Sequence, residues 1–194
     1  VRGIVATILG YEYWGCDLSA PQIEANRKQA EQICPNKKPV WICGDSTEEL
    51  LKAPEADFIF SCPPYADLEV YSDDSRDLST MEYPDFLAAY ERIISLCYNK
   101  LKDDRFACFV VGDVRDTKGY YRGFVADTIN TFRNCGFKFY NDIILVSPVG
   151  SLSIRAGISF DASRKLGKQH QNVLLFVKGN PKKATEAIGA LKLK

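Results

Sequence analysis

The chain has 194 residues, 46% of them hydrophobic, and its 25 Lys and Arg balance its 25 Asp and Glu. That length predicts one domain with a sizeable core, and the zero net charge excludes a uniformly basic, histone-like binder of polyanions. An enzyme that gathers its positive charge around one cleft remains compatible with this balance. The sequence contains no run of about 18 apolar residues, so no transmembrane helix is predicted.

The first part of the chain predicts helices that alternate with short apolar strands. Ser19 is suited to cap a helix over residues 22–33, and Pro21 fits its first turn. The unbroken apolar run within residues 57–61 predicts a buried strand. The other elements expected here are the end of a helix over 4–9 closed by Gly10, strands over 13–16 and 40–43, and a short helix over 47–52.

The second part of the chain continues this alternation. Apolar residues recur at helical spacing over 83–101, and another helix is expected over 121–135, ending at Gly136. Between the helices we expect an acidic loop over 66–80, strands over 106–111, 137–146 and 172–178, and a loop rich in Gly, Ser, Arg and Lys over 147–168.

This order of elements predicts the fold class. Helices between apolar strands are typical of an α/β fold whose mostly parallel sheet is covered on both faces. No helix-length crossover is predicted between strands 137–146 and 172–178, so these two are expected to form a C-terminal antiparallel pair. We assign residues 1–179 to one domain and residues 180–194 to a Lys- and Ala-rich C-terminal tail.

The cysteines and the histidine limit the chemistry that the chain offers. Seven cysteines are scattered without a Cys-x-x-Cys pair, and His170 is the only histidine. Such a set favours reduced, mostly buried thiols in a cytoplasmic protein over a disulfide framework or a zinc site. We therefore expect no metal and no association with a membrane.

Polar or proline-rich residues follow four of the predicted strands, namely Asp17, Asp45, residues 62–65 and Asp113. In open α/β sheets, ligands bind beyond the carboxyl ends of the strands. These residues are therefore expected to line one edge of the sheet. For any single Asp, a role in a turn or a helix cap is the simpler interpretation, but four such strand ends together favour a binding site.

The most informative segment is Asp-Phe-Ile-Phe-Ser-Cys-Pro-Pro-Tyr, residues 57–65. Two consecutive prolines after a strand fix the backbone and remove two N–H donors, which leaves carbonyl acceptors in a preset geometry. Tyr65 adds an aromatic face beside them. The combination suits a planar ring that carries an exocyclic amine, because carbonyls accept the amine hydrogens while the ring stacks. The simpler alternative is a turn that ends the strand, with a packed tyrosine.

Residues 61–65 resemble the catalytic motif of the DNA amino-methyltransferases, in which Asp, Asn or Ser precedes Pro-Pro and an aromatic residue. The resemblance implies a Rossmann-like class I methyltransferase sheet and a bacterial or phage-encoded enzyme. It also implies transfer of a methyl group from S-adenosylmethionine to N6 of adenine or N4 of cytosine in a flipped-out base of double-stranded DNA. The catalytic residues that it implies are Ser61, Cys62, Pro63, Pro64 and Tyr65.

Two further segments are similar to the family's cofactor motifs. Gly-Cys-Asp-Leu-Ser, residues 15–19, resembles the motif whose acidic residue binds the ribose hydroxyls of the cofactor, and this residue maps onto Asp17. Gly44-Asp45-Ser46 resembles the next motif, whose acidic side chain lies beside the adenine amine. The resemblance thus implies an S-adenosylmethionine site formed by Asp17, Leu18, Ser19, Asp45, Ser46 and Ser61.

The sequence departs from the family pattern at two points. Cys62 occupies the position before Pro-Pro, and a thiol is a weaker acceptor than a carboxylate or an amide, so the backbone carbonyls of Cys62 and Pro63 would hold the amine. The family's first strand and Gly-rich loop are missing before Val1, which resembles the residues just after that loop. We therefore expect this strand to lie upstream, or the cofactor site to be incomplete.

Contacts with DNA are expected from a basic segment that flanks the motif. Residues 147–168 contain few acids and read as a mobile phosphate-contacting or base-flipping loop, although an ordinary solvated loop has a similar composition. The acidic segment 66–77, with Tyr71, is expected to gate the pocket or to contact another part of the protein. The DNA-binding residues predicted in the basic segment are Arg155, Arg164, Lys165 and Lys168.

Two other functions share these features. An RNA or protein-glutamine amino-methyltransferase carries a similar Pro-Pro-Tyr motif, and a non-catalytic remnant of the fold would bind DNA or a partner. Cys62 and the missing first strand favour the remnant. The oligomeric state is left open.

Overall fold

The structure, a computed structural model, describes residues 1–65, 70–148, 150 and 152–190. The chain alternates helices and strands as predicted, and it separates into two units of contacting residues. Unit 1 comprises Val1–Asp57 and Ala66–Asp103, and unit 2 comprises Phe58–Tyr65 and Asp104–Lys194. None of the helices in the described part of the chain is long and apolar enough to span a membrane.

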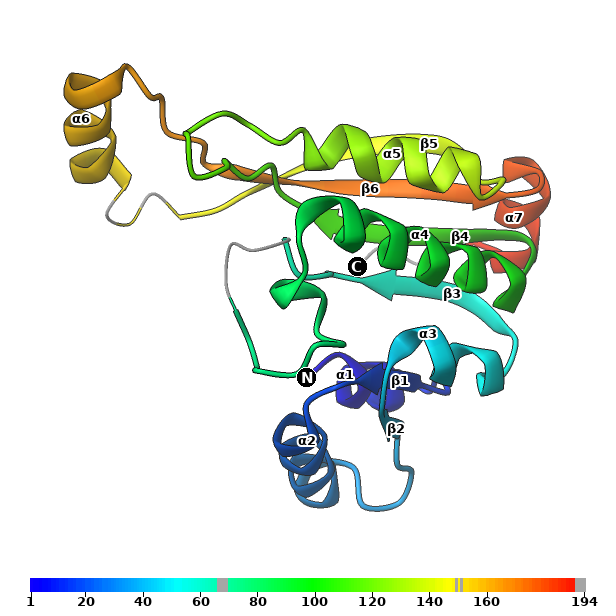
Figure 1. The fold of residues 1–194 in the computed structure, drawn as a ribbon. Helices are drawn as coiled ribbons and strands as arrows, with labels where there is room; N and C mark the ends of the chain where they lie inside the picture. The colour runs from blue at the N-terminus through cyan, green and yellow to red at the C-terminus, as the bar shows by residue number, and fades with distance from the viewer. Residues whose placement is uncertain (66–69, 149, 151, 191–194) are drawn as a thin grey trace. The chain divides into compact units, whose positions relative to one another are not determined.

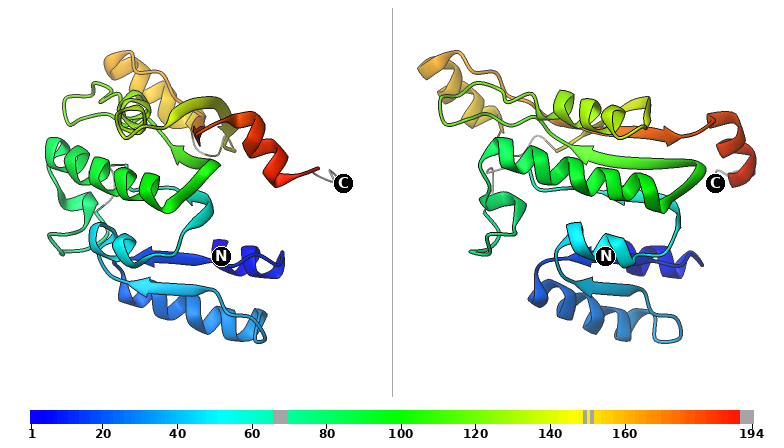
Figure 2. Two further views of the ribbon diagram at one scale, coloured as in Figure 1. Left: turned by 90° about the vertical axis from the view of Figure 1, so that its right-hand side faces the viewer. Right: turned by 45° about the vertical axis from the view of Figure 1, so that its right-hand side comes forward.

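Unit 1 is built around two parallel strands, β1 and β2, which pair from Trp14↔Val40 to Asp17↔Cys43. Helix α2 contacts both strands, as Figure 2 shows. The Ser19 side chain accepts a hydrogen bond from the backbone N–H of Gln22, so the predicted N-cap of this helix is confirmed. The elements of this unit are α1 (Arg2–Ile8), β1 (Trp14–Asp17), α2 (Ala20–Ile33), β2 (Val40–Cys43), α3 (Ser46–Glu49), η1 (Leu50–Lys52), η3 (Leu78–Thr80) and α4 (Tyr83–Lys100).

A small core cluster joins α1, α2 and β2. It consists of Ile4, Ile23, Ala30 and Trp41, and the Tyr13 ring meets Trp41 edge-on at 6.1 Å between ring centroids. A Cβ atom added to Gly3 would lie 2.7 Å from the Tyr13 ring. Glycine is therefore required where α1 approaches these aromatic rings.

Unit 2 contains a four-stranded sheet of order β3-β4-β6-β5. Strand β6 runs antiparallel to both β4 and β5, whereas β3 and β4 point the same way in Figure 1. The predicted mostly parallel sheet with a C-terminal antiparallel pair is thus confirmed. The elements of this sheet and its surroundings are β3 (Ala56–Ser61), β4 (Leu101–Val111), α5 (Phe124–Asn134), β5 (Lys138–Val146), α6 (Leu152–Ser163), β6 (His170–Lys178) and α7 (Pro181–Ile188).

The core of unit 2 is aromatic. Phe132 of α5 is fully buried, and its ring stacks on Phe176 of β6 at 3.8 Å between centroids. Phe109 of β4 and Phe137 also pack against Phe132, at 4.7 and 4.9 Å. These contacts fix α5 on the sheet, and α5 starts beside the residues of the candidate site.

Two of the expected elements differ in the structure. The segment 147–168 is not a continuous loop, because α6 occupies Leu152–Ser163. Strands β5 and β6 nevertheless pair antiparallel, because α6 still allows the chain to return beside β5. Helix α5 begins at Phe124 rather than at residue 121, because Tyr121 is held in an extended bridge with Arg115.

Burial was also overestimated at two places. Phe58 and Phe60 of β3 are 54% and 45% exposed, since β3 has a hydrogen-bonded neighbour on one side only among the described strands. All seven cysteines are thiols, as expected, but only Cys97 and Cys108 are buried, and Cys43 is exposed. Apolar neighbours in the sequence do not by themselves place a thiol in the core.

Candidate active site

Tyr65 is held by hydrogen bonds at its hydroxyl group. The hydroxyl oxygen accepts a hydrogen bond from Nε2 of Gln171 at 2.7 Å, and the hydroxyl lies 3.5 Å from the carbonyl oxygen of Val110, to which it donates. Both partners belong to central strands of the sheet, β6 and β4. The phenol of a half-buried tyrosine is thereby fixed in orientation.

Two neighbours define the space around the Tyr65 ring. Gly112 lies directly against it, and a Cβ atom there would be 3.2 Å from Cε2 of the ring. The ring of Phe124, the first residue of α5, lies 6.0 Å from the Tyr65 centroid at a tilt of 52°. The carboxylate of Asp113 accepts a hydrogen bond from the Phe124 backbone N–H at 2.9 Å. Asp113 therefore positions the start of α5, as the simpler interpretation of this strand end predicts.

The residues before Tyr65 follow the carboxyl end of β3. Ser61, Cys62, Pro63 and Pro64 are all half-buried, and the Sγ atom of Cys62 lies 3.7 Å from the Tyr65 hydroxyl oxygen. The Cys62 thiol thus points at the phenol. This leaves the backbone carbonyls as the strong acceptors of the segment, because the prolines offer no N–H.

Sequence reasoning had missed Gln171, Val110 and Gly112 as parts of this arrangement. The available signal for Gln171 was the polar run His170-Gln171-Asn172 at the start of a strand that is otherwise mainly apolar. The glycine after the β4 strand was a signal for close approach. Their convergence on Tyr65 depends on strand pairing, which joins residues more than 100 positions apart.

In unit 1, the predicted cofactor residues lie at the carboxyl ends of β1 and β2. Oδ1 of Asp17 accepts the backbone N–H of Ser19 at 2.9 Å, and Asp45 accepts both the backbone N–H and the hydroxyl of Thr47, at 2.7 and 2.8 Å. Asp17 is exposed, and Leu18, Asp45 and Ser46 are half-buried. The structure brings these strand ends together, while Ser61 belongs to unit 2.

Two thiols tie the strand ends to each other. Sγ of Cys16 donates to the carbonyl of Gly44 at 3.1 Å, and Sγ of Cys43 lies 3.7 Å from the carbonyl of Leu18. The backbone N–H of Gly44 in turn donates to the backbone carbonyl of Asp17 at 3.0 Å. Burial raises the pKa of the Cys16 thiol to about 11, so at neutral pH it keeps the proton that it donates.

The sequence of the chain was compared with models of protein families. The model of the N6/N4-type DNA methylases matches residues 56–192, which is more than half of the chain and includes Ser61–Tyr65 and all the partners of Tyr65 described above. The chain belongs to the DNA methylase family. A search of curated proteins gives no match to the chain.

Solved structures show the same fold. TTHA0409 of Thermus thermophilus, described as a candidate DNA modification methylase, is 18% identical with a TM-score of 0.54; the match covers 94% of this chain and 56% of that one. Another structure of TTHA0409, in complex with S-adenosyl-L-methionine, is 20% identical over 78% of this chain and 56% of that one, with a TM-score of 0.51. A TehB-like S-adenosylmethionine-dependent methyltransferase of Corynebacterium glutamicum is 16% identical, covering 91% and 73%, with a TM-score of 0.51.

These similarities show that the chain has the Rossmann-like class I methyltransferase fold. The chain spans just over half the length of TTHA0409. The region that matches the family model starts at β3 and lies mainly in unit 2.

The predicted DNA-binding residues lie on or after α6, which extends beyond the strand ends in Figure 1. Arg155 is exposed. Arg164 donates to the carbonyl of Phe160 at 3.0 Å, which partly engages its guanidinium. Lys165 and Lys168 are half-buried, and Lys165 lies against Gly119. Their contact with DNA stays a prediction.

Asp74 and Asp77 of the acidic segment both make contacts within it. Asp74 forms an ion pair with Arg76 at 2.6 Å, and this hydrogen-bonded contact lowers the pKa of Asp74 to about 2. The buried Asp77 accepts the hydroxyl of Ser72 at 2.8 Å and caps η3. Asp67 and Glu69, also predicted for this segment, lie outside the described residues. The gating role stays a prediction.

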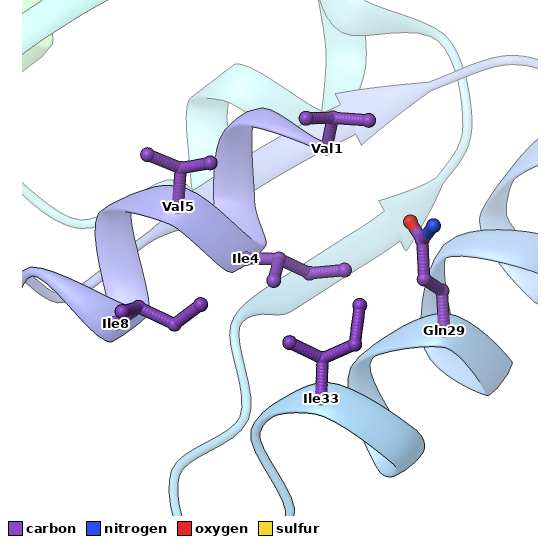
Figure 3. Close-up of a pocket in the computed structure, with 6 residues that line it drawn as sticks. All are labelled: Val1, Ile4, Val5, Ile8, Gln29 and Ile33. Carbon is purple, nitrogen blue, oxygen red and sulfur yellow. The ribbon is translucent and has the colours of Figure 1, made fainter.

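Two hollows in unit 1 offer little chemistry. The larger, of about 230 Å³, lies between α1 and α2, where Figure 3 shows apolar side chains with one amide, Gln29. The other, of about 200 Å³, includes Arg27, Glu31, Lys38 and Trp41. Neither contains any of the predicted site residues, so the candidate active site is defined by Tyr65 and its partners.

Proposed function

We propose that this DNA methylase transfers a methyl group from S-adenosylmethionine to the exocyclic amine of a flipped-out DNA base, N4 of cytosine or N6 of adenine. One observation carries the proposal. A Cys-Pro-Pro-Tyr segment follows the carboxyl end of β3, and its tyrosine is anchored by Gln171 and Val110. A rigid aromatic ring next to preset carbonyl acceptors is suited to binding a planar base that carries an amine.

The residues of the segment have separate roles in this proposal. Tyr65 stacks on the extruded base, and the backbone carbonyls of Cys62 and Pro63 accept the hydrogens of its amine. These acceptors also stabilise the positive charge that the amine develops as it reacts. The amine then loses one proton to solvent, so a strong general base is not required. The Cys62 thiol packs beside the phenol rather than acting as a nucleophile.

The strand ends of unit 1 fit S-adenosylmethionine by the chemistry of their donors and acceptors. The cofactor supplies a methyl group on a sulfonium centre. Within the described part of the chain, Oδ2 of Asp17 makes no hydrogen bond, so it remains able to accept ribose hydroxyls. Leu18 and Ser19 follow it, and Asp45 and Ser46 lie at the neighbouring strand end. Carboxyl ends of parallel strands are the usual ligand sites of this type of sheet.

Mass spectrometry of nucleosides tests the proposed activity. DNA incubated with the protein and S-adenosylmethionine is expected to gain N4-methylcytosine or N6-methyladenine. Methylation of RNA or of glutamine in protein would assign the activity to one of those substrates instead. If no substrate is methylated although DNA binds, the chain is a binding remnant.

The cytoplasmic location of the protein and its bacterial or phage origin stay predictions, as does its action on double-stranded DNA.

Replacing Asp17 with alanine is expected to weaken the binding of S-adenosylhomocysteine. Loss of hydrogen bonds to a charged group amounts to about 1.5–3 kcal/mol, which corresponds to a dissociation constant roughly 10- to 150-fold higher. Isothermal titration calorimetry measures this change. Asp17→Asn keeps an oxygen for the Ser19 N–H, and it separates the loss of charge from the loss of the turn. Glu24→Ala, on the exposed face of α2, is the matched control. An affinity unchanged by Asp17→Ala would contradict the assignment.

A further inference from the structure

The segment between β4 and α5 forms a tight hairpin, residues 114–122, that the site described above does not use. The backbone N–H of Asp116 donates to the backbone carbonyl of Tyr120 at 2.8 Å, and that of Arg122 donates to the backbone carbonyl of Val114 at 2.9 Å. Arg115 and Tyr121 form an antiparallel bridge between the two arms. The hairpin is thus closed by backbone hydrogen bonds from its base to its turn.

Side chains reinforce this hairpin from within. The guanidinium of Arg115 lies over the Tyr121 ring at 3.8 Å and donates to the carbonyl of Gly119 at 2.8 Å. The Asp116 carboxylate accepts the N–H of Tyr120 at 2.9 Å. Both groups are therefore engaged in shaping the turn. Tyr120 is left 71% exposed, next to the exposed Lys118 at the tip.

Both ends of the hairpin meet the candidate active site. Gly112, two residues before it, lies against the Tyr65 ring, and Phe124, two residues after it, lies 6.0 Å from that ring. Four residues of extended chain reach at most about 14 Å, and the Phe124 side chain and the gap between the two rings add roughly 10 Å. The Tyr120 backbone therefore lies within roughly 24 Å of the Tyr65 ring. That span corresponds to about seven nucleotide steps of 3.4 Å. Tyr120 is therefore presented within a short distance of the proposed target base.

The charges around the tip favour a polyanion. Lys165, which follows α6, lies against Gly119 and so adds a second ammonium group beside Lys118. The two acidic side chains of the region, Asp113 and Asp116, both accept hydrogen bonds from backbone N–H groups. An exposed aromatic ring on a hairpin that also carries ammonium groups is a combination with which proteins bind nucleic-acid strands, since the ring stacks on a base and the cations neutralise phosphates.

We infer that the 114–122 hairpin is a second DNA-contacting element of the methylase. Tyr120 stacks on an unpaired or unstacked base within about seven nucleotides of the target, and Lys118 contacts a phosphate of the same strand. The inference rests on the proposed action on DNA and adds to it a specific contact. Extruding a base opens the stack beside it, and an exposed ring on a rigid hairpin can cover the base face that is left.

Binding to a fluorescein-labelled DNA duplex of about 20 base pairs with one unpaired base tests this inference, with fluorescence anisotropy as the readout. Loss of one base–aromatic stack is worth about 1–3 kcal/mol, so Tyr120→Ala is expected to raise the dissociation constant roughly 5- to 150-fold. Tyr120→Phe retains the ring and is expected to bind as the wild type does. Lys118→Gln is expected to lower the slope of log K against log salt by about 0.9.

Matched controls and contrary outcomes separate this inference from the proposed function. Tyr11→Ala removes a similarly exposed tyrosine from unit 1, and Lys182→Gln an exposed lysine from α7; neither is expected to change binding. Wild-type affinity in Tyr120→Ala, with DNA binding and methylation intact, would overturn the inference alone. Equal losses in the Phe and Ala variants would overturn stacking. A loss seen only with RNA of the same sequence would overturn the assignment to DNA, and failure of the wild type to bind DNA would overturn the proposed function as well.

Discussion

Replacing Tyr65 with alanine is expected to lower the rate of methyl transfer by about a hundredfold or more, because the target base loses the surface that positions it. The affinity for S-adenosylhomocysteine is expected to stay unchanged, since the predicted cofactor carboxylates belong to unit 1. Single-turnover transfer of a labelled methyl group to DNA measures the first quantity, and calorimetric titration the second. A rate close to that of the wild type would contradict the stacking role.

Companion variants separate the ring of Tyr65 from its anchoring. Tyr65→Phe keeps the ring but removes the hydrogen bonds to Gln171 and Val110, so a smaller loss of rate is expected than in Tyr65→Ala. Gln171→Leu removes the donor at 2.7 Å but keeps the hydrogen bond from the phenol to Val110, so its loss of rate is expected not to exceed that of Tyr65→Phe. Gly112→Val places methyl groups against the ring and is expected to lower the rate while sparing cofactor affinity.

Replacing Phe132 with alanine is expected to lower the free energy of unfolding by about 3–5 kcal/mol, the usual range for a buried phenylalanine. The ring is fully buried and stacks on Phe176 at 3.8 Å, with Phe109 and Phe137 on other sides. Its removal leaves a cavity that three rigid rings are poorly able to fill. Urea unfolding followed by far-ultraviolet circular dichroism measures the change.

A control at an exposed phenylalanine distinguishes burial from residue type. Phe160 of α6 is 44% exposed, and its ring contacts the Arg164 guanidinium at 5.0 Å. Phe160→Ala is expected to change the free energy of unfolding by less than about 1 kcal/mol. A loss below about 1 kcal/mol for Phe132→Ala would mean that the aromatic cluster does not hold α5 on the sheet.

Local signals predicted most of the elements well. The strand over 40–43 has the bounds of β2, and the Ser19 cap and Pro21 start α2, because capping and proline geometry depend on a few adjacent residues. The apolar spacing over 83–101 likewise predicted α4. Helix α6 was missed because Gly157 and several serines lower its intrinsic helix propensity, although Ile154 and Ile158 have helical spacing.

Where elements meet, local signals no longer decide. The residues from Tyr121 onward have a composition that is compatible with a helix. The bridge between Tyr121 and Arg115 holds Tyr121 in an extended conformation, however, and α5 begins only at Phe124. The apolar run of β3 predicted burial, whereas the exposure of Phe58 depends on which strands and helices cover it. Both outcomes follow from contacts between residues that are not neighbours in the sequence.

The sequence by itself determined the α/β class, the antiparallel C-terminal pair and the Cys-Pro-Pro-Tyr segment, because each depends on local periodicity or on adjacent residues. Only the tertiary structure showed that Gln171 anchors Tyr65, and that Lys165 and Lys118 converge on one hairpin. Strand pairing and loop packing create those contacts, and a one-dimensional pattern carries no distance between positions so far apart.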